Sequence, residues 1–434
     1  MRRVIFIALV CLIALTAVPY GTFEPWWKAA LVFAVFAICI LALVEGAISG
    51  STYVGPRSIL LPLLALSAFA FVQTISMGAI QDSGLTGMQP WNTISADPYQ
   101  TRFFALQILA LTVYLALLYR YANDEGRMRI LIHVVIGVAV ASALFGLLRQ
   151  ASQQSEASFL LPLLKRNQGY GQFLNKNHFA YLMEMAFGLG VGLIVTRGIR
   201  PDRLLIYAAL LFPIWIALVL SNSRGGILAM LTQVLIATLW FLRPQGVLKP
   251  ALLGVIVVAV LLGTLWVGGD KLATNLESAT THFSGDTTRD GASRNEIWRA
   301  TLKMFVAHPI AGVGFGGYWI GITAFHDASG TLTPQEAHNE YLEVLSSGGV
   351  IGLAIFVWFV VMVVGRVQTN LQTDRGDIRA VRVAALLGIT GVVVHSLVDF
   401  GLHMMSNALI FIVLLMLLTA AMHKKIIDPS VQQQ

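Results

Sequence analysis

The chain has 434 residues, of which 56% are hydrophobic and only 12% are charged. A soluble domain averages about 25% charged residues, so this composition and the mean hydropathy of +0.74 exclude an ordinary soluble protein. The net charge of +7 does not indicate a nucleic-acid-binding protein, because basic residues of membrane proteins collect on cytoplasmic loops. Apolar runs of about 20 residues predict membrane helices, whereas barrel strands alternate over about 10 residues.

Apolar runs that can cross a bilayer, which takes about 17–25 residues, recur along the whole chain. We therefore predict an all-α polytopic membrane protein with about twelve transmembrane helices. The first run follows Arg2 and Arg3, and we interpret it as a retained helix and not as a cleaved signal peptide. The predicted spans are 4–18, 26–44, 58–78, 102–120, 130–148, 177–196, 204–220, 226–242, 247–267, 348–365, 380–398 and 406–422.

The basic residues indicate the orientation of the spans. If both chain ends lie in the cytoplasm, every inward segment is basic, as the positive-inside rule requires. The inward basic residues are Arg2, Arg3, Arg57, Arg120, Arg127, Arg129, Arg197, Arg200, Arg203, Arg243, Lys249, Arg366, Arg375, Arg379, Arg382, Lys424 and Lys425.

Two outward segments are long, 149–176 and 268–347. A connection of about 80 residues is too long to be passive, and the second one carries helical patterns at 294–307 and 336–346. We predict three parts: residues 1–267 with spans one to nine, a loop of helices at 268–347, and residues 348–434 with the last three spans and a C-terminal tail.

Four outward segments carry cationic or amide side chains that a passive loop would not need. They are KRNQGYGQFLNKNH at 165–178, SNSRGG at 221–226, RDGASRNEIWR at 289–299, and EAHNEYLEVLSSGG at 336–349. Alone, each has a structural interpretation: Arg224 could extend to the bilayer interface, Arg294 and Arg299 could pair with Glu296, and Lys165, Arg166 and Lys176 could contact the bilayer surface.

Taken together, these segments favour a binding site for an anion with several oxygens. Guanidinium groups suit phosphate or pyrophosphate because their planar fork donates two parallel hydrogen bonds. An arginine at membrane depth, such as Arg224, costs a few kcal/mol and usually faces an internal cavity with an anionic partner.

The pattern around His338 does not favour a metal site. Glu340 and Glu343 lie two and five residues after it, which is not the spacing that places two ligands on one helical face. The sequence has no HExxH motif, and His308 and His326 in the same loop match no familiar ligand pattern. We therefore predict no metal and no cofactor.

Several motifs together resemble the O-antigen ligase and polymerase superfamily of bacterial inner membranes. They are GQFLNKNHFA at 171–180, SNSRGG at 221–226, R-x-x-x-W at 294–298, HPIAGVGFGG at 308–317 and AHNEYLEVLSSGGVIG at 337–352. The element HN-x-x-L-x-x-L-x-x-x-G is the most specific. The motifs extend over about 170–352, and the first five spans resemble the superfamily only in topology.

The resemblance implies a GT-C-like glycosyltransferase with its large periplasmic loop over the site. Its donor would be O-antigen glycan on undecaprenyl pyrophosphate, and its acceptor lipid A–core oligosaccharide. The reaction would invert the anomeric centre, need no metal, and take place on the periplasmic face of the inner membrane to complete lipopolysaccharide.

The chemistry of such a reaction assigns roles to the candidate residues. Arg224 and Arg294 would stabilise the charge that develops on the leaving pyrophosphate. Histidine ordinarily titrates near neutral pH, so His338 could remove the proton of the acceptor hydroxyl or orient the acceptor. The predicted substrate-binding residues are Arg166, Lys176, Asn177, Ser223, Arg299 and Asn339.

Other activities remain open. An O-antigen or exopolysaccharide polymerase, or a protein O-oligosaccharyltransferase, would use the same donor chemistry. A transporter of a lipid-linked anion would suit about twelve spans, but transporters usually have two related halves. The single large loop has no counterpart in the first half of this chain.

The predicted orientation can be tested by labelling single cysteines in intact cells. An impermeant thiol reagent should label Gly330→Cys in the loop 268–347 but not Ile199→Cys in the inward segment 197–203. Labelling at position 199 and protection at position 330 would reverse the orientation, and with it the side on which the site lies.

Overall fold

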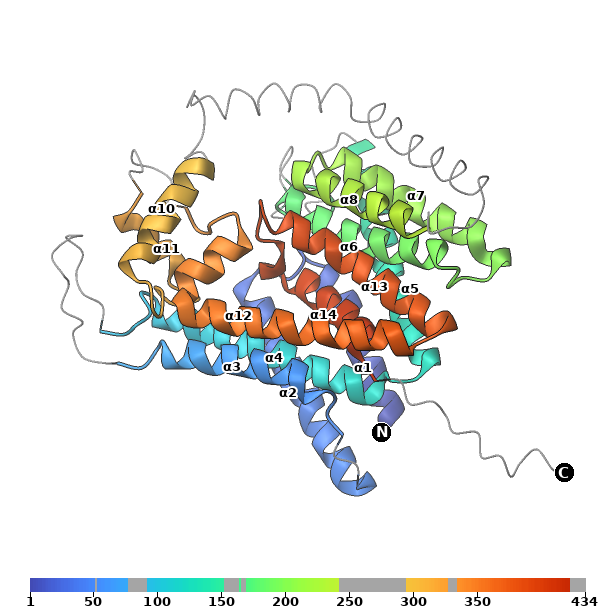
Figure 1. Ribbon diagram of the computed structural model, residues 1–434, viewed down its shortest axis with the longest axis horizontal. Helices are drawn as coiled ribbons and strands as arrows, with labels where there is room; N and C mark the ends of the chain where they lie inside the picture. Colours follow the sequence, from blue (N-terminus) through green and yellow to red (C-terminus); the bar gives the residue numbers. More distant parts are fainter. Residues whose placement is uncertain are drawn as a thin grey trace.

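The computed structural model describes residues 1–50, 53–76, 92–151, 164, 169–241, 294–326 and 334–421. The predicted ninth span at 247–267, the loop residues 268–293, and Lys165 and Arg166 lie outside the described residues. The described part is built from helices and contains no β-strand, which confirms the all-α class (Figure 1).

Every predicted span except the ninth coincides with a described helix, and the chain is a multi-pass membrane protein. Among the described helices, seven are long and apolar enough to cross a membrane, and three more are apolar but shorter. The longer helices are α1 (Arg2–Ala17), α2 (Pro25–Ser49), α3 (Arg57–Val72), α4 (Pro98–Tyr121), α5 (Glu125–Ala151), α6 (Lys176–Val195), α7 (Leu204–Leu220), α8 (Arg224–Phe241), α10 (Arg294–Ala307), α12 (Glu340–Thr373), α13 (Gly376–His395) and α14 (Met405–Thr419). The short ones are η1 (Pro201–Arg203), α11 (Tyr318–Gly321), η2 (Ile322–Ala324) and η3 (Gly401–His403).

Two predicted elements are joined in α12. A short amphipathic helix and a membrane span meet at Gly349, whose φ of 61° and ψ of −159° are not helical. A side chain at this position would be strained, and a Cβ there would lie 2.4 Å from the carbonyl oxygen of Ile310. Gly349 therefore redirects the chain from the outward loop into the bilayer.

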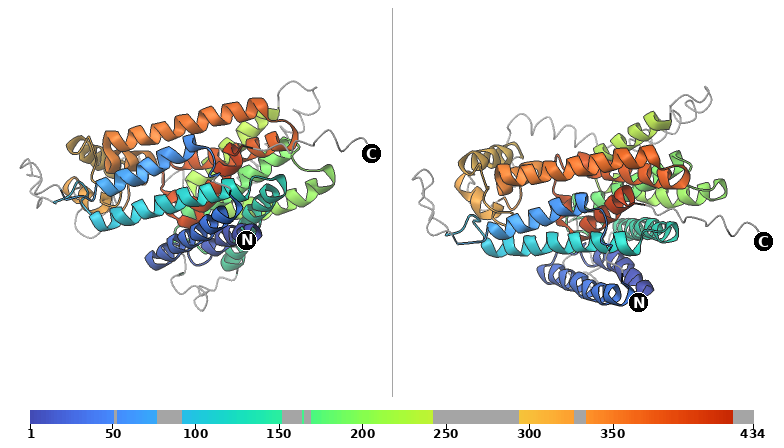
Figure 2. Two further views of the ribbon diagram at one scale, coloured as in Figure 1. Left: turned by 90° about the horizontal axis from the view of Figure 1, so that it is seen from below. Right: turned by 60° about the horizontal axis from the view of Figure 1, so that its bottom comes forward.

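Helices α6, α13 and α14 form the centre of the bundle. Helix α13 packs on α6, α8 and α14, and nearly all of α14 is buried. Small residues allow α6 and α13 to approach closely: a Cβ on Gly188 would lie 2.8 Å from the Cα of Gly388, and one on Gly192 would lie 2.4 Å from the Cα of Ala384. Helices α1 and α2 lie together at one edge (Figure 2).

The predicted inward residues gather at one end of the bundle. Arg382 is fully buried and donates to Asp374 Oδ2 at 3.0 Å and to the Leu417 carbonyl at 2.8 Å. Asn370 donates to the Leu418 carbonyl and Arg366 to the Thr419 carbonyl. Cations and amide donors thus satisfy the last carbonyls of α14, where the helix dipole is negative.

The predicted outward segments gather at the other end. Helices α10 and α11 cover this end beside the start of α12 (Figure 1). The structure thus agrees with the predicted alternation of inward and outward loops. Which end faces the periplasm remains a prediction.

The α6–α13 interface gives a test of the packing. Gly192→Ala should destabilise the protein by about 1–3 kcal/mol, the usual cost of overpacking, because the new methyl group would meet the backbone of Ala384. Gly137→Ala on α5 is the matched control: outside its own turn of the helix, no atom lies within 4 Å of its Cβ position, so alanine should add up to about 1 kcal/mol of helix propensity. Thermal unfolding in detergent measures both, and equal melting temperatures would refute the close approach.

Candidate functional site

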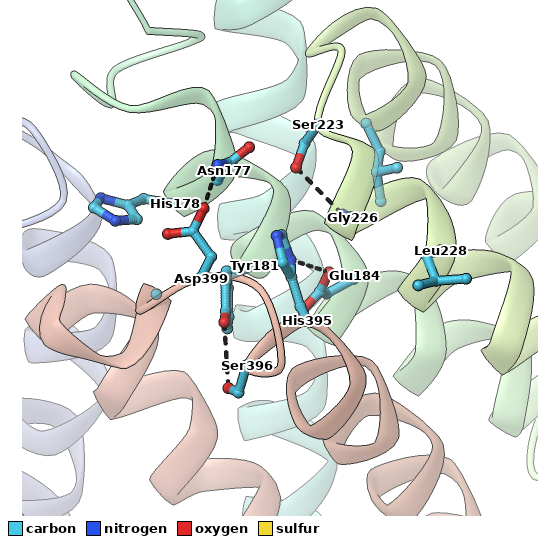
Figure 3. Close-up of polar contacts among 12 residues, drawn as sticks. Asn177, His178, Tyr181, Glu184, Ser223, Gly226, Leu228, His395, Ser396 and Asp399 are labelled. Carbon is cyan, nitrogen blue, oxygen red and sulfur yellow. Dashed lines mark hydrogen bonds and ion pairs between the residues drawn. The ribbon is translucent and has the colours of Figure 1, made fainter. Parts of the chain in front are cut away.

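A buried carboxylate, Asp399, is the centre of the outward polar cluster. It follows the C-terminal end of α13 and has no exposed side-chain area. The Asn177 side-chain amide donates to its Oδ2 atom (Figure 3). Arg294 Nη2 lies 3.5 Å from the same oxygen, and His338 Nδ1 lies 3.8 Å from Oδ1. One side chain thus joins three of the four segments that the sequence singled out.

The surroundings of Asp399 keep it ionised. Burial alone would raise the pKa of this carboxyl group. The interaction with His338, the electrostatic effect of His178 and His395 and the backbone N–H of Phe400 outweigh burial and hold that pKa well below its usual range. Asp399 is therefore a permanent negative charge beside His338 and Arg294 at neutral pH.

His338 is held so that only part of its ring is accessible. Its side chain is 34% exposed, but Nδ1 is buried and faces Asp399, so the exposed area belongs to the rest of the ring. The backbone has a φ of 50°, in the left-handed region that non-glycine residues rarely adopt. The ring also packs edge-on against Phe400, with centroids 4.8 Å apart. This arrangement leaves the other ring nitrogen for a ligand.

Four helices begin at this cluster. Asn177 is the second residue of α6, Arg224 the first of α8, and Arg294 the first of α10. His338 lies two residues before α12. Helix N-termini carry unpaired N–H groups and a partial positive charge, which attract anions. The site therefore combines the positive ends of helix dipoles with the positive charges of two guanidinium groups.

Arg224 and Ser223 form the turn that opens α8. Arg224 is exposed, and the charge of Arg294 acts on it electrostatically, so the two arginines lie on the same side of the site. Ser223 is fully buried and its Oγ accepts the N–H of Gly226 at 3.2 Å, as a helix cap (Figure 3). The hydroxyl of Ser223 thus holds the turn on which Arg224 lies.

Three other predicted binding residues have different surroundings. The side-chain Oδ1 of Asn339 caps α12 by accepting the N–H groups of Tyr341 and Leu342, and its side-chain amide donates to the Leu397 carbonyl. Lys176 and Arg299 are exposed. Arg299 lies five positions after Arg294, about 140° round the helix at 3.6 residues per turn, and therefore points away from Asp399. Arg166 lies outside the described residues.

The glycine-rich segment 312–317 is held by the first half of the chain. Gln73, at the end of α3, is fully buried and donates to the carbonyls of Ala311 at 2.7 Å and Ser347 at 2.9 Å. Its Oε1 atom accepts the N–H of Phe315 at 3.3 Å. Gln73 therefore fastens both the glycine-rich segment and the end of the amphipathic part of α12.

A second cluster of charges adjoins the site. His403 Nε2 lies 3.5 Å from both Glu340 Oε2 and Glu343 Oε1. Burial would lower the pKa of His403, but Glu343 and Glu340 outweigh it and raise that pKa to about 10. His403 therefore carries a positive charge at neutral pH. No group of three or more His, Cys, Asp or Glu residues in the described part of the chain is arranged to hold a metal ion.

Sequence reasoning missed Asp399, His403 and the buried pair of Glu184 and His395. The first two lie in DFGLHMM at 399–405, a connection between the last two predicted spans that is much shorter than the outward segments 149–176 and 268–347. A signal existed: acidic and histidine residues at or within membrane spans are costly and usually functional.

Part of the chain is similar to a known protein family. The family model described as O-Antigen ligase matches residues 208–357. No curated protein matches the chain significantly. The matched segment contains Arg224, Arg294 and His338, whereas Asn177 and Asp399 lie on either side of it.

Proposed function

We propose that this chain, of which residues 208–357 match the family model described as O-Antigen ligase, transfers a glycan from undecaprenyl pyrophosphate to lipid A–core oligosaccharide. The transfer takes place on the periplasmic face of the inner membrane, inverts the anomeric centre and uses no metal ion. The observation that carries this proposal is the position of His338 and Arg294 on the same buried carboxylate, Asp399. A group that can accept a proton and a group that can bind phosphate thus share one anchor.

His338 acts on the acceptor. Asp399 Oδ1 lies 3.8 Å from Nδ1 of the ring, on the side where a serine protease places its aspartate, so the other ring nitrogen is the one that faces the acceptor. The free nitrogen removes the proton of the acceptor hydroxyl as the oxygen attacks the anomeric carbon. The developing imidazolium is stabilised by the negative charge of Asp399.

Arg224 and Arg294 act on the donor. The bond between the anomeric carbon and the pyrophosphate oxygen breaks, and its electron pair leaves with the pyrophosphate. Guanidinium groups and the first turns of α8 and α10 stabilise this charge as it grows, which lowers the barrier without a cation. Attack from the His338 side and departure toward the arginines, on opposite faces of the sugar, give inversion.

The conservative substitutions Arg224→Lys and Arg294→Lys test the assignment. Each keeps the charge but loses the bidentate fork, so transfer by the purified protein should fall on the order of 10²-fold or more. Arg299→Lys is the matched control on the same helix as Arg294, and should keep wild-type turnover because Arg299 points away from Asp399. Near-wild-type rates of both site variants would show that the arginines only anchor the chain at the interface.

The same assay separates the possible acceptors. Lipid-linked glycan is supplied with lipid A–core, with a second lipid-linked repeat unit, or with protein, each in excess EDTA. Product on lipid A–core alone supports the ligase. Product on a repeat unit or on protein would instead identify a polymerase or an O-oligosaccharyltransferase with the same donor, and loss of all turnover in EDTA would refute the metal-free reaction.

A further inference from the structure

Beneath the site, two buried side chains pair within the membrane bundle. Nδ1 of His395, the last residue of α13, lies 2.9 Å from Oε2 of Glu184 on α6. The two side chains are 1% and 0% exposed. The imidazole ring also stacks on Tyr181, with centroids 4.1 Å apart and an interplanar angle of 17°. Figure 3 shows this pair next to Asn177 and Asp399 on one side and the Ser223 turn on the other.

Stability alone does not explain such a pair. Removing two charges from water is costly, and replacing a buried pair by apolar residues of similar volume is often neutral or stabilising. Within a membrane bundle, buried ionisable residues usually have a function. The side-chain hydrogen bond of Glu184 and His395 joins these two residues to each other and not to His338, so a role in the reaction must act through other residues.

The backbone of His395 leads directly to Asp399 and His338, which form the proton-accepting half of the site. Its carbonyl accepts the N–H groups of Val398 at 2.9 Å and Asp399 at 3.1 Å. The next residue, Ser396, bonds through its hydroxyl to Tyr181 at 3.2 Å and through its carbonyl to the N–H of Glu340 at 3.0 Å. The segment after α13 thus fixes Asp399 and the first turn of α12, which follows His338.

The ring of His395 supports the first turn of α8, which carries Arg224 and belongs to the phosphate-binding half of the site. A Cβ on Gly225 would lie 2.3 Å from Cδ2 and 2.5 Å from Nε2 of His395, so the first turn of α8 rests directly on the imidazole. A glycine at position 225 is required for this contact. Arg224 is the neighbouring residue, and its position therefore depends on where the ring lies.

We propose that Glu184 and His395 are positioning residues, whose hydrogen bond sets the distance between the Arg224 turn and the Asp399–His338 pair. This inference rests on the proposed function. The hydrogen bond fixes the ring of His395. The ring touches the Arg224 turn, and the backbone of the same residue holds Asp399. Misplacing reacting groups by about 1 Å can cost on the order of 10²-fold in rate, so this link matters for turnover.

The decisive variant replaces both members by apolar residues of similar size, Glu184→Leu with His395→Phe. Phenylalanine keeps the stack on Tyr181, and no buried polar atom loses its partner, so the melting temperature should be at least that of the wild type. Turnover should nevertheless fall on the order of 10–100-fold, while binding of the lipid-linked donor is retained. Glu184→Gln keeps a hydrogen bond to the ring and should retain most of the turnover.

Gln233→Leu is the control, because Gln233 is buried in the same interface and donates to the carbonyls of Glu184 and Leu387 but does not touch either half of the site. It should keep wild-type turnover per folded protein. Wild-type turnover of the double variant, or equal losses in all three variants, would overturn the proposal.

If the double variant does not fold, Glu184→Gln against Glu184→Leu decides instead, and equal turnover per folded protein would refute the positioning role. The turnover of each variant is expressed relative to that of the wild type, for whichever glycan transfer the wild type performs. A wild type with no such transfer would instead refute the proposed function.

Discussion

A carboxylate buried at the outward end of the bundle, Asp399, organises the site. An ionised aspartate without exposed area is stable only when neighbouring donors and cations compensate for its lost hydration. Asn177, Arg294 and His338 provide them, and they come from α6, α10 and the segment before α12. Electrostatic compensation of one charge thus brings together groups that lie up to 222 residues apart in the sequence.

The rest of the fold holds the elements around this charge. Glycines at 188 and 192 allow α6 and α13 to pack backbone to backbone, which brings Asn177 and Asp399 to the same level. Gln73 fastens the glycine-rich segment and the amphipathic part of α12 to the end of α3. The first spans, which carry no motif of their own, therefore act as the support of the outward helices.

The sequence predicted the elements well because apolar length and basic loops are local properties. Helix 294–307 was predicted at the bounds that the structure shows for α10. The sequence could not reveal that Asp399 joins the predicted segments, because this contact depends on how α13 packs on α6. The third span was predicted to reach residue 78, but α3 ends at Val72 and the next residue, Gln73, turns its side chain to the loop. The polar groups of Ser223 and Asn339 cap helices, a use that composition does not distinguish from ligand binding.

The most direct test of this account is the coupling between His338 and Asp399. Transfer rates of purified His338→Ala, Asp399→Asn and the double variant are compared with the wild type, with donor binding measured alongside. The account predicts that each single variant loses on the order of 10²–10⁴-fold in turnover. The double variant should be no slower than the slower single one, because the two residues act as a unit, and all three should still bind the donor. Near-wild-type turnover of Asp399→Asn, or losses that multiply in the double variant, would contradict it.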